Sequence, residues 1–240
     1  ISEGNIRYTD ATMPIDLTVR NLTHNGSGDI TATNYDLETS TQIEALSVIY
    51  DGIGYLNRTK LNADMTLGID AANSVYTFKE GDVTLNDFAL GIDGFVKMPT
   101  DDIEMDLAFQ SKQSSFKSLL SLIPAMFLEG FEQLKAEGEL VFNGSVKGTY
   151  NETTIPGFLV NLTVKDGFFQ YPDLPSAVKN VQIVAKVDGS DGNLNNLLVD
   201  VSKFSMNLGN NPVSGKMTMR GLEEYNINAD LNAKIDLAEV

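Results

Sequence analysis

Leu17-Thr-Val-Arg-Asn-Leu22, Val83-Thr-Leu-Asn-Asp-Phe-Ala-Leu90 and Val199-Asp-Val-Ser-Lys-Phe-Ser-Met206 are the stretches that decide the fold. Each alternates apolar and polar residues, which is the period of a half-buried strand. Each then shifts by one residue and resumes on the other parity, as a β-bulge or sheet corner requires. The pattern therefore predicts a repeated β unit, with bulges or corners at Arg20-Asn21, Asn86-Asp87 and Ser202-Lys203.

Further alternating runs are unusually long. Leu61 to Ile69, Ile103 to Phe109, Phe158 to Val164 and Ile227 to Leu237 each place apolar residues on one face and polar residues on the other. One apolar face and one wet face are typical of an antiparallel sheet covered on a single side. We expect a mainly β fold, with long antiparallel strands in a repeat-built, twisted or curved open sheet or groove.

One segment has a helical period instead. Phe116, Leu119, Leu120 and Ile123 follow Ser114, a favourable N-cap residue, and Pro124 interrupts the pattern. We therefore predict one short helical segment between two β regions. The expected division is a first β-repeat region over 1–110, a helical insertion over 111–136 and a second β-repeat region over 137–240. The strands are expected to form one continuous sheet. The sequence is expected to be a fragment of a longer chain, because Ile1 is not a start methionine.

Composition restricts the possible functions. The chain of 240 residues has a net charge of −16, which argues against nucleic-acid binding. It has no cysteine and one histidine, His24, so it offers no thiolate nucleophile and no cysteine or paired-histidine metal site. No catalytic motif is present. We expect a protein that is not an enzyme, with no cofactor, no metal and no catalytic residue.

The apolar face near the helical segment is the candidate binding surface. We predict that it lines or gates a space that accepts acyl chains, although the same residues could form an ordinary core. The predicted lipid-groove residues are Phe109, Phe116, Leu120, Phe127, Phe131, Phe142 and Val146.

The region from Gly138 to Val187 carries a family resemblance. It contains Gly144-Ser-Val-Lys-Gly148, Ile155-Pro156, Asp166-Gly-Phe-Phe-Gln-Tyr-Pro-Asp-Leu-Pro175 and Val178-Lys-Asn-Val181. This order resembles the C-terminal periplasmic region of AsmA-like proteins, of the type found in Bacteroidetes, which are related to bridge-like lipid transfer proteins. The residues that match the family motif are interpreted as structural: Asp166, Gly167, Phe169, Pro172, Asp173, Leu174, Pro175 and Asn180. Gly167 is expected to permit a turn with positive φ.

The resemblance implies a periplasmic location, with the full-length protein tethered to the inner membrane by a segment outside this sequence. It also implies a curved, open groove with an apolar inner surface, and a role in lipid transport and outer-membrane biogenesis without catalysis. Possible partners are a phospholipid or other acyl lipid and other envelope proteins.

Two alternatives stay open from the sequence. The first is a structural or interaction β domain that assists envelope protein assembly. The second is a carbohydrate-binding or adhesive surface module. A closed core would favour the first, and a surface cluster of aromatic residues would favour the second.

Overall fold

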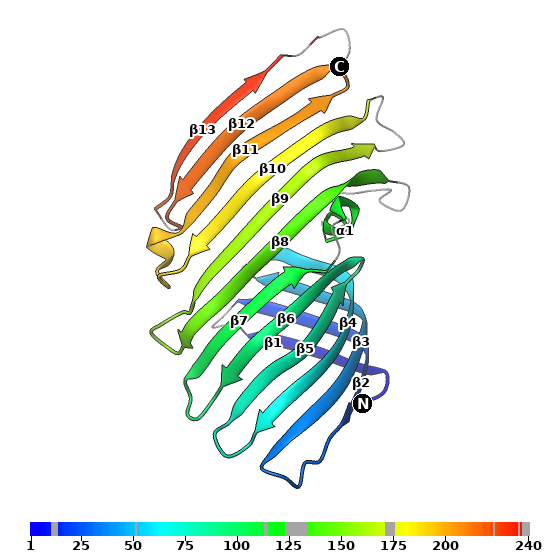
Figure 1. The fold of residues 1–240 in the computed structure, drawn as a ribbon, viewed down its shortest axis with the longest axis vertical. Helices are drawn as coiled ribbons and strands as arrows, with labels where there is room; N and C mark the ends of the chain where they lie inside the picture. Colours follow the sequence, from blue (N-terminus) through cyan, green and yellow to red (C-terminus); the bar gives the residue numbers. More distant parts are fainter. Residues whose placement is uncertain are drawn as a thin grey trace. The chain divides into compact units, whose positions relative to one another are not determined.

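A computed structural model describes residues 1–10, 14–50, 52–112, 115–122, 134–170, 176–222, 224–234 and 236. Its thirteen strands follow one another in chain order in an open antiparallel sheet, with one short α-helix (Figure 1). Well over half of the chain lies in strands, and many of these exceed the usual length of about 5–6 residues. The predicted mainly β fold with an open sheet of long strands is therefore confirmed.

The chain divides into two compact units. The N-terminal unit comprises Ile1–Pro99 and Ser118–Glu129, and the C-terminal unit comprises Thr100–Lys117 and Gly130–Val240. The strands of the N-terminal unit are β1 (Gly4–Asp10), β2 (Ile15–Ser27), β3 (Asn34–Tyr50), β4 (Ile53–Asp70), β5 (Val75–Leu85) and β6 (Phe88–Lys97). The three-part division predicted from the sequence stays a prediction.

The C-terminal unit contains the other strands and a short 3-10 helix. Its elements are β7 (Ile103–Ser111), β8 (Lys135–Tyr150), β9 (Gly157–Gln170), β10 (Val178–Gly189), η3 (Leu194–Asn196), β11 (Leu198–Leu208), β12 (Asn211–Arg220) and β13 (Asn226–Ala233). The α-helix α1 (Phe116–Leu120) lies within the predicted helical insertion. Ser114 and the stretch 123–133 lie outside the described residues.

Two of the three predicted irregularities are β-bulges. In β2, Leu22 and Val19 pair with Gly4 and Ile6 of β1, so β2 carries one extra residue at Arg20-Asn21. Asn21 there adopts φ 54°. In β11, Val201 and Phe204 pair with Met217 and Gly215, so the extra residue falls at Ser202-Lys203. The bulge predictions at these two places are confirmed.

The third prediction is wrong. Leu85 pairs with Phe88, so Asn86-Asp87 forms the two-residue turn of the β5–β6 hairpin and not a bulge or corner within a strand. Asn86 adopts φ 51°, a region that Asn tolerates well. A polar pair that shifts the alternation fits a bulge and a two-residue turn equally well, so the pattern alone could not distinguish them.

The expected turn at Gly167 is also absent. Gly167 lies within β9, and the positive φ of 50° belongs to Asp166 at a bulge opposite Glu137 and Glu139 of β8. Gly167 is required for a different reason: an added Cβ would stand 2.8 Å from Cβ of Val181 and 3.3 Å from the ring of Phe116. The glycine therefore permits close packing rather than a turn.

The other motif residues divide between bulges, packing and undescribed chain. Asn180 adopts φ 55° at a bulge in β10, next to the bulge of β9. Phe169 packs against Phe116 with ring centroids 6.5 Å apart. Pro172, Asp173, Leu174 and Pro175 lie outside the described residues.

Gly167→Ala should destabilise the protein by about 1–3 kcal/mol, because the added methyl group overpacks a buried site against Val181. Gly54→Ala is the matched control, since Gly54 also lies in a strand but has no atom within 4 Å of the added Cβ. Urea unfolding would measure both free energies. Equal stability of the two variants would contradict the packing role of Gly167.

Candidate functional site

The C-terminal unit presents one sheet face without a polar side chain in three successive rows. Directly paired residues on neighbouring strands project to the same side of a sheet, so each row forms a continuous line of contacts. The first row runs through Phe109, Gly144, Val160, Val187, Val199, Met219 and Ile227. The second runs through Phe142, Leu162, Ala185, Val201, Met217 and Ala229, and the third through Leu140, Val164, Ile183, Phe204, Gly215 and Leu231. We call these three rows the apolar face.

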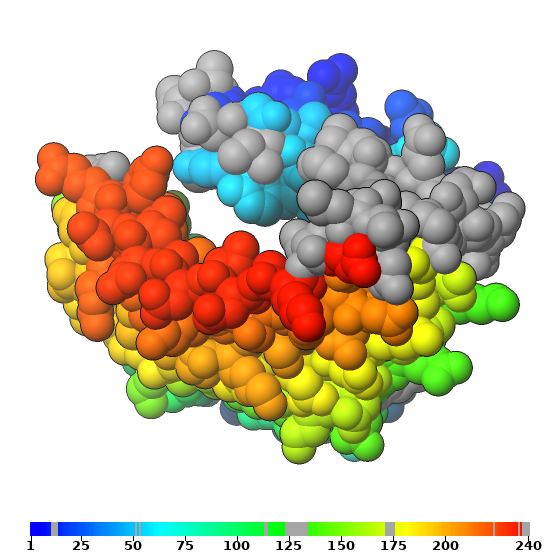
Figure 2. All heavy atoms as spheres, turned by 90° about the horizontal axis from the view of Figure 1, so that it is seen from above, coloured from blue at the N-terminus to red at the C-terminus, as the bar shows by residue number. Residues whose placement is uncertain are grey.

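Burial of the apolar face changes from one end to the other. Leu140 in β8 and Val164 in β9, which pair in the third row, are each 1% exposed, so this part of the face is core. Ile227 is 52% exposed and Leu231 is 72% exposed, both in β13. In Figure 2 the red atoms of β13 lie beside the orange atoms of β12, at the last strand of this unit. The end of the apolar face at β11–β13 is therefore accessible to solvent.

Three of the predicted lipid-groove residues lie together. Phe109 and Phe142 belong to the first and second rows, and their ring centroids are 5.8 Å apart. The ring of Phe109 covers Gly144, where a larger residue would clash with it. Val146 lies in the adjoining row between Leu107 and Phe158. All three side chains are only half-buried.

The other predicted residues do not join this patch. Phe116 is 4% exposed and packs against Phe169 and Gly167, so it contributes to the core of the C-terminal unit. Leu120 is half-buried and belongs to the N-terminal unit. Phe127 and Phe131 lie outside the described residues.

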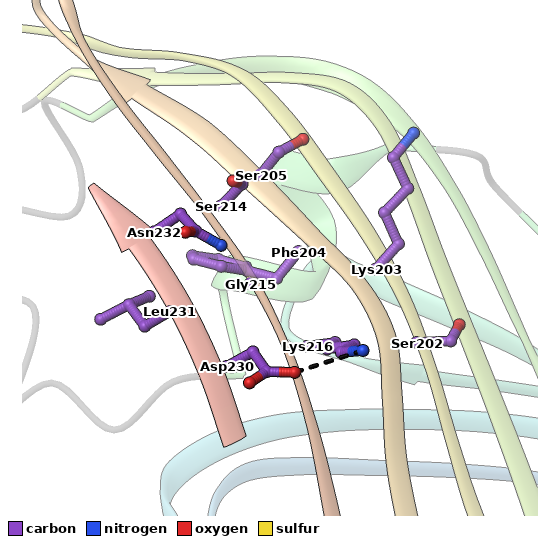
Figure 3. Close-up of a pocket in the computed structure, with 10 residues that line it drawn as sticks. All are labelled: Ser202, Lys203, Phe204, Ser205, Ser214, Gly215, Lys216, Asp230, Leu231 and Asn232. Carbon is purple, nitrogen blue, oxygen red and sulfur yellow. Dashed lines mark ion pairs between the residues drawn. The ribbon is translucent and has the colours of Figure 1, made fainter. Parts of the chain in front are cut away.

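The accessible end of the apolar face lies outside the predicted lipid-groove residues. A shallow depression of about 510 Å³ lies across β11–β13. Besides Phe204, Gly215 and Leu231 it is lined by seven polar or charged residues: Ser202, Lys203, Ser205, Ser214, Lys216, Asp230 and Asn232. Figure 3 shows the ring of Phe204 beside Gly215, and Leu231 on the neighbouring strand β13. The alternation from Ile227 onward was the available signal, but it does not show which apolar positions remain uncovered.

Charged residues lie on the opposite face. Lys216 pairs with Asp230 at 3.2 Å, also drawn in Figure 3, and Lys147 pairs with Asp106 at 2.6 Å. These cross-strand pairs are exposed, so each contributes little to stability. They keep one face wet while the other stays free of charge.

The loop after β10, Asp188-Gly-Ser-Asp-Gly192, is a tight turn in which the N–H of Gly192 donates to the carbonyl of Gly189 at 3.0 Å. Asp191 accepts hydrogen bonds from the backbone N–H of Asn193 at 2.9 Å and from the Asn196 side chain at 2.7 Å, which lowers its pKa. The pKa of Asp188 is lowered by hydrogen bonds from Lys186 and Ser190. Among the described residues, no group of three or more His, Cys, Asp or Glu side chains could hold a metal ion.

Acid should weaken the fold partly through Asp188. A lowered native pKa stabilises the folded state above the unfolded pKa of about 3.9, and this contribution is lost as the pH falls below that value. Asp188→Asn should therefore lose less stability than the wild type between pH 5 and pH 2, measured as the shift of the urea midpoint. Equal losses would show that Asp188 makes no such contribution.

Comparisons with known proteins do not identify this chain. No known protein family, curated protein or solved structure matches it. The resemblance to AsmA-like proteins therefore stays a prediction from short motifs. Across the part of the chain that the structure describes, no helix has the length and apolar character needed to cross a membrane.

Leu231→Asp should leave the free energy of unfolding within about 0.5 kcal/mol of the wild type, because Leu231 is an exposed position. Leu140→Asp should unfold the domain, because it buries an unpaired charge. Urea titration followed by circular dichroism measures both effects. A large loss of stability in Leu231→Asp would mean that β13 is covered in solution.

Proposed function

We propose that this protein binds acyl lipids on the apolar face of its C-terminal unit and carries them without covalent chemistry. The observation that supports this proposal most directly is the absence of any polar side chain from three successive rows of a half-exposed sheet. A ligand on such a surface is held by burial, since the surface itself offers no hydrogen-bonding or charged side chain.

The size of the face is compatible with an extended alkyl chain. The first row crosses β7 to β13, which is roughly 29 Å at a strand spacing of about 4.8 Å. Each methylene group removed from water contributes about 0.8 kcal/mol, so burial of roughly ten gives about 8 kcal/mol before the cost of ordering the chain. Gly215 carries no side chain beside Phe204, and Leu231 of the next strand lies against it.

The exposure pattern also favours a binding surface over a closed core. Contiguous apolar patches above a few hundred Å² are uncommon on soluble monomers and usually mark a binding site. Ile227 and Leu231 extend two rows that are already apolar, so they enlarge one patch rather than stand as isolated surface residues.

The proposed cellular location and biological role rest on the family resemblance. We propose a periplasmic protein whose full-length form is tethered to the inner membrane and takes part in lipid transport or outer-membrane biogenesis. The proposed partners are a phospholipid or other acyl lipid and other envelope proteins. Lipid binding by the purified protein can be tested independently of its cellular location.

Uptake of a fluorescent phospholipid from vesicles tests the function. Leu231→Asp places a charge on the accessible end of the apolar face and should reduce uptake at least several-fold. Asn228→Asp is the matched control, because it adds the same charge to the same exposed strand, in the register row of Thr218 and Asp200 on the opposite face. Uptake should be unchanged in this control.

The uptake experiment also tests the alternative that this chain is a structural or interaction β domain that assists envelope protein assembly. All eight residues of β13 are exposed, so this strand could pair with a strand of another envelope protein. A wild-type protein that neither co-purifies with lipid nor takes it up from vesicles would refute lipid carriage by this chain and favour that alternative.

A further inference from the structure

Three basic side chains gather on the polar face of the N-terminal unit, although the chain is strongly acidic. Arg20 of β2 and both Arg58 and Lys60 of β4 line a depression of about 520 Å³ that crosses β3. The other lining residues are Asn21, Thr23, Gln42, Ile43, Glu44, Ala45 and Asn62. We call this the basic depression.

Bulges shape the basic depression on both flanking strands. Asn21 adopts φ 54° in the bulge of β2, and its N–H donates to Oδ1 of Asn5 at 3.2 Å. Arg58 adopts φ 53° in a bulge of β4, and its N–H donates to Oγ of Ser47 at 3.0 Å. Bulges redirect neighbouring side chains, and here each is fixed by a side chain of the adjacent strand.

A small residue lies between the basic strands. Ala45 pairs with Arg20 on the polar side of the sheet, yet it is only 8% exposed. A long basic side chain commonly covers apolar surface with its methylene groups and leaves its charged end in water. Because the side chain of Ala45 is a single methyl group, the middle of the basic depression lies lower than the long basic side chains beside it.

The charge balance of the basic depression is unusual for this protein. Lys79 and Lys147, elsewhere in the chain, form close ion pairs with aspartates, at 2.6 Å each. Among the described residues, the side chains of Arg20, Arg58 and Lys60 form no ion pair, and Glu44 is the one carboxylate in the lining. The lining thus carries two net positive charges in a chain of net charge −16.

We propose that the basic depression binds a phosphate group, either free or on a lipid headgroup. A phosphate monoester carries about −1.5 to −2 charges at pH 7, which matches the excess of two cations. Guanidinium groups donate paired hydrogen bonds to phosphate oxygens, and the side-chain amides of Asn21, Gln42 and Asn62 add neutral donors. This site lies on the polar face, so its test does not depend on lipid binding by the apolar face.

Titration with glycerol 3-phosphate, followed by NMR or calorimetry at low salt, tests the proposal. The triple variant Arg20→Gln, Arg58→Asn and Lys60→Gln should weaken binding at least about tenfold, since it removes all three cationic hydrogen-bond donors of the lining. Asn is chosen at position 58 because it tolerates positive φ. Glu44→Gln should tighten binding, because it removes the one negative charge of the lining.

The matched control removes the same charge elsewhere. Lys165, Lys179 and Lys234 are exposed residues of the C-terminal unit, and their replacement by Gln should leave phosphate affinity unchanged. Equal weakening in this control would overturn the proposal, since it would show a general effect of net charge. Absence of saturable binding both to glycerol 3-phosphate and to vesicles that contain phosphatidic acid would overturn it as well.

Vesicles distinguish the two sources of phosphate. Phosphatidylcholine vesicles with and without phosphatidic acid would be compared in a flotation assay. Binding of glycerol 3-phosphate without preference for phosphatidic acid supports a soluble phosphate ester. A preference for phosphatidic acid that the triple variant loses and the control keeps supports a lipid headgroup.

Discussion

Long strands in this protein are constrained by the two-residue period of β structure. A strand keeps its apolar side chains on one face only while its register is maintained, and a slip of one residue would move all of them to the other face. The extra residue at Ser202-Lys203 is accommodated by a bulge, so Val201 and Phe204 occupy the same apolar face. The bulge at Arg20-Asn21 does the same for Val19 and Leu22. The separation of the sheet into an apolar face and a polar face depends on these bulges.

Bulges in neighbouring strands reinforce one another. Within the C-terminal unit, β9 and β10 carry bulges at Asp166 and Asn180, and both residues have positive φ. Local twist increases at each bulge, so adjacent bulges bend the strands together without breaking the ladder. The strands of this unit curve along their length in Figure 1. In the N-terminal unit the bulge at Arg20-Asn21 has two effects: it keeps Val19 and Leu22 on the apolar face and it shapes the basic depression on the polar face.

Recognition on the apolar face would need no conserved chemistry of the usual kind. Burial of methylene groups is non-directional, and it scales with the area removed from water. Any apolar residue can then contribute to the face, although size and shape still differ among Val, Leu, Ile, Met, Phe, Ala and Gly. This is why a search for catalytic or metal-binding patterns finds nothing, and why a binding surface can still be present. The basic depression is the opposite case, because phosphate binding needs charge and directed donors.

Alternation by itself determined that this chain forms long antiparallel strands with one apolar and one polar face, because that period is a local property of β structure. It also located two bulges, and it grouped Phe109, Phe142 and Val146 on one side of the sheet. It could not separate the hairpin turn at Asn86-Asp87 from a bulge, since both reverse the parity. Nor could it assign Gly167 to close packing, because the contact with Val181 comes from a neighbouring strand. Only the tertiary structure decided that Leu140 is core and Leu231 is surface, because burial depends on what packs over a residue and not on its place in the alternation.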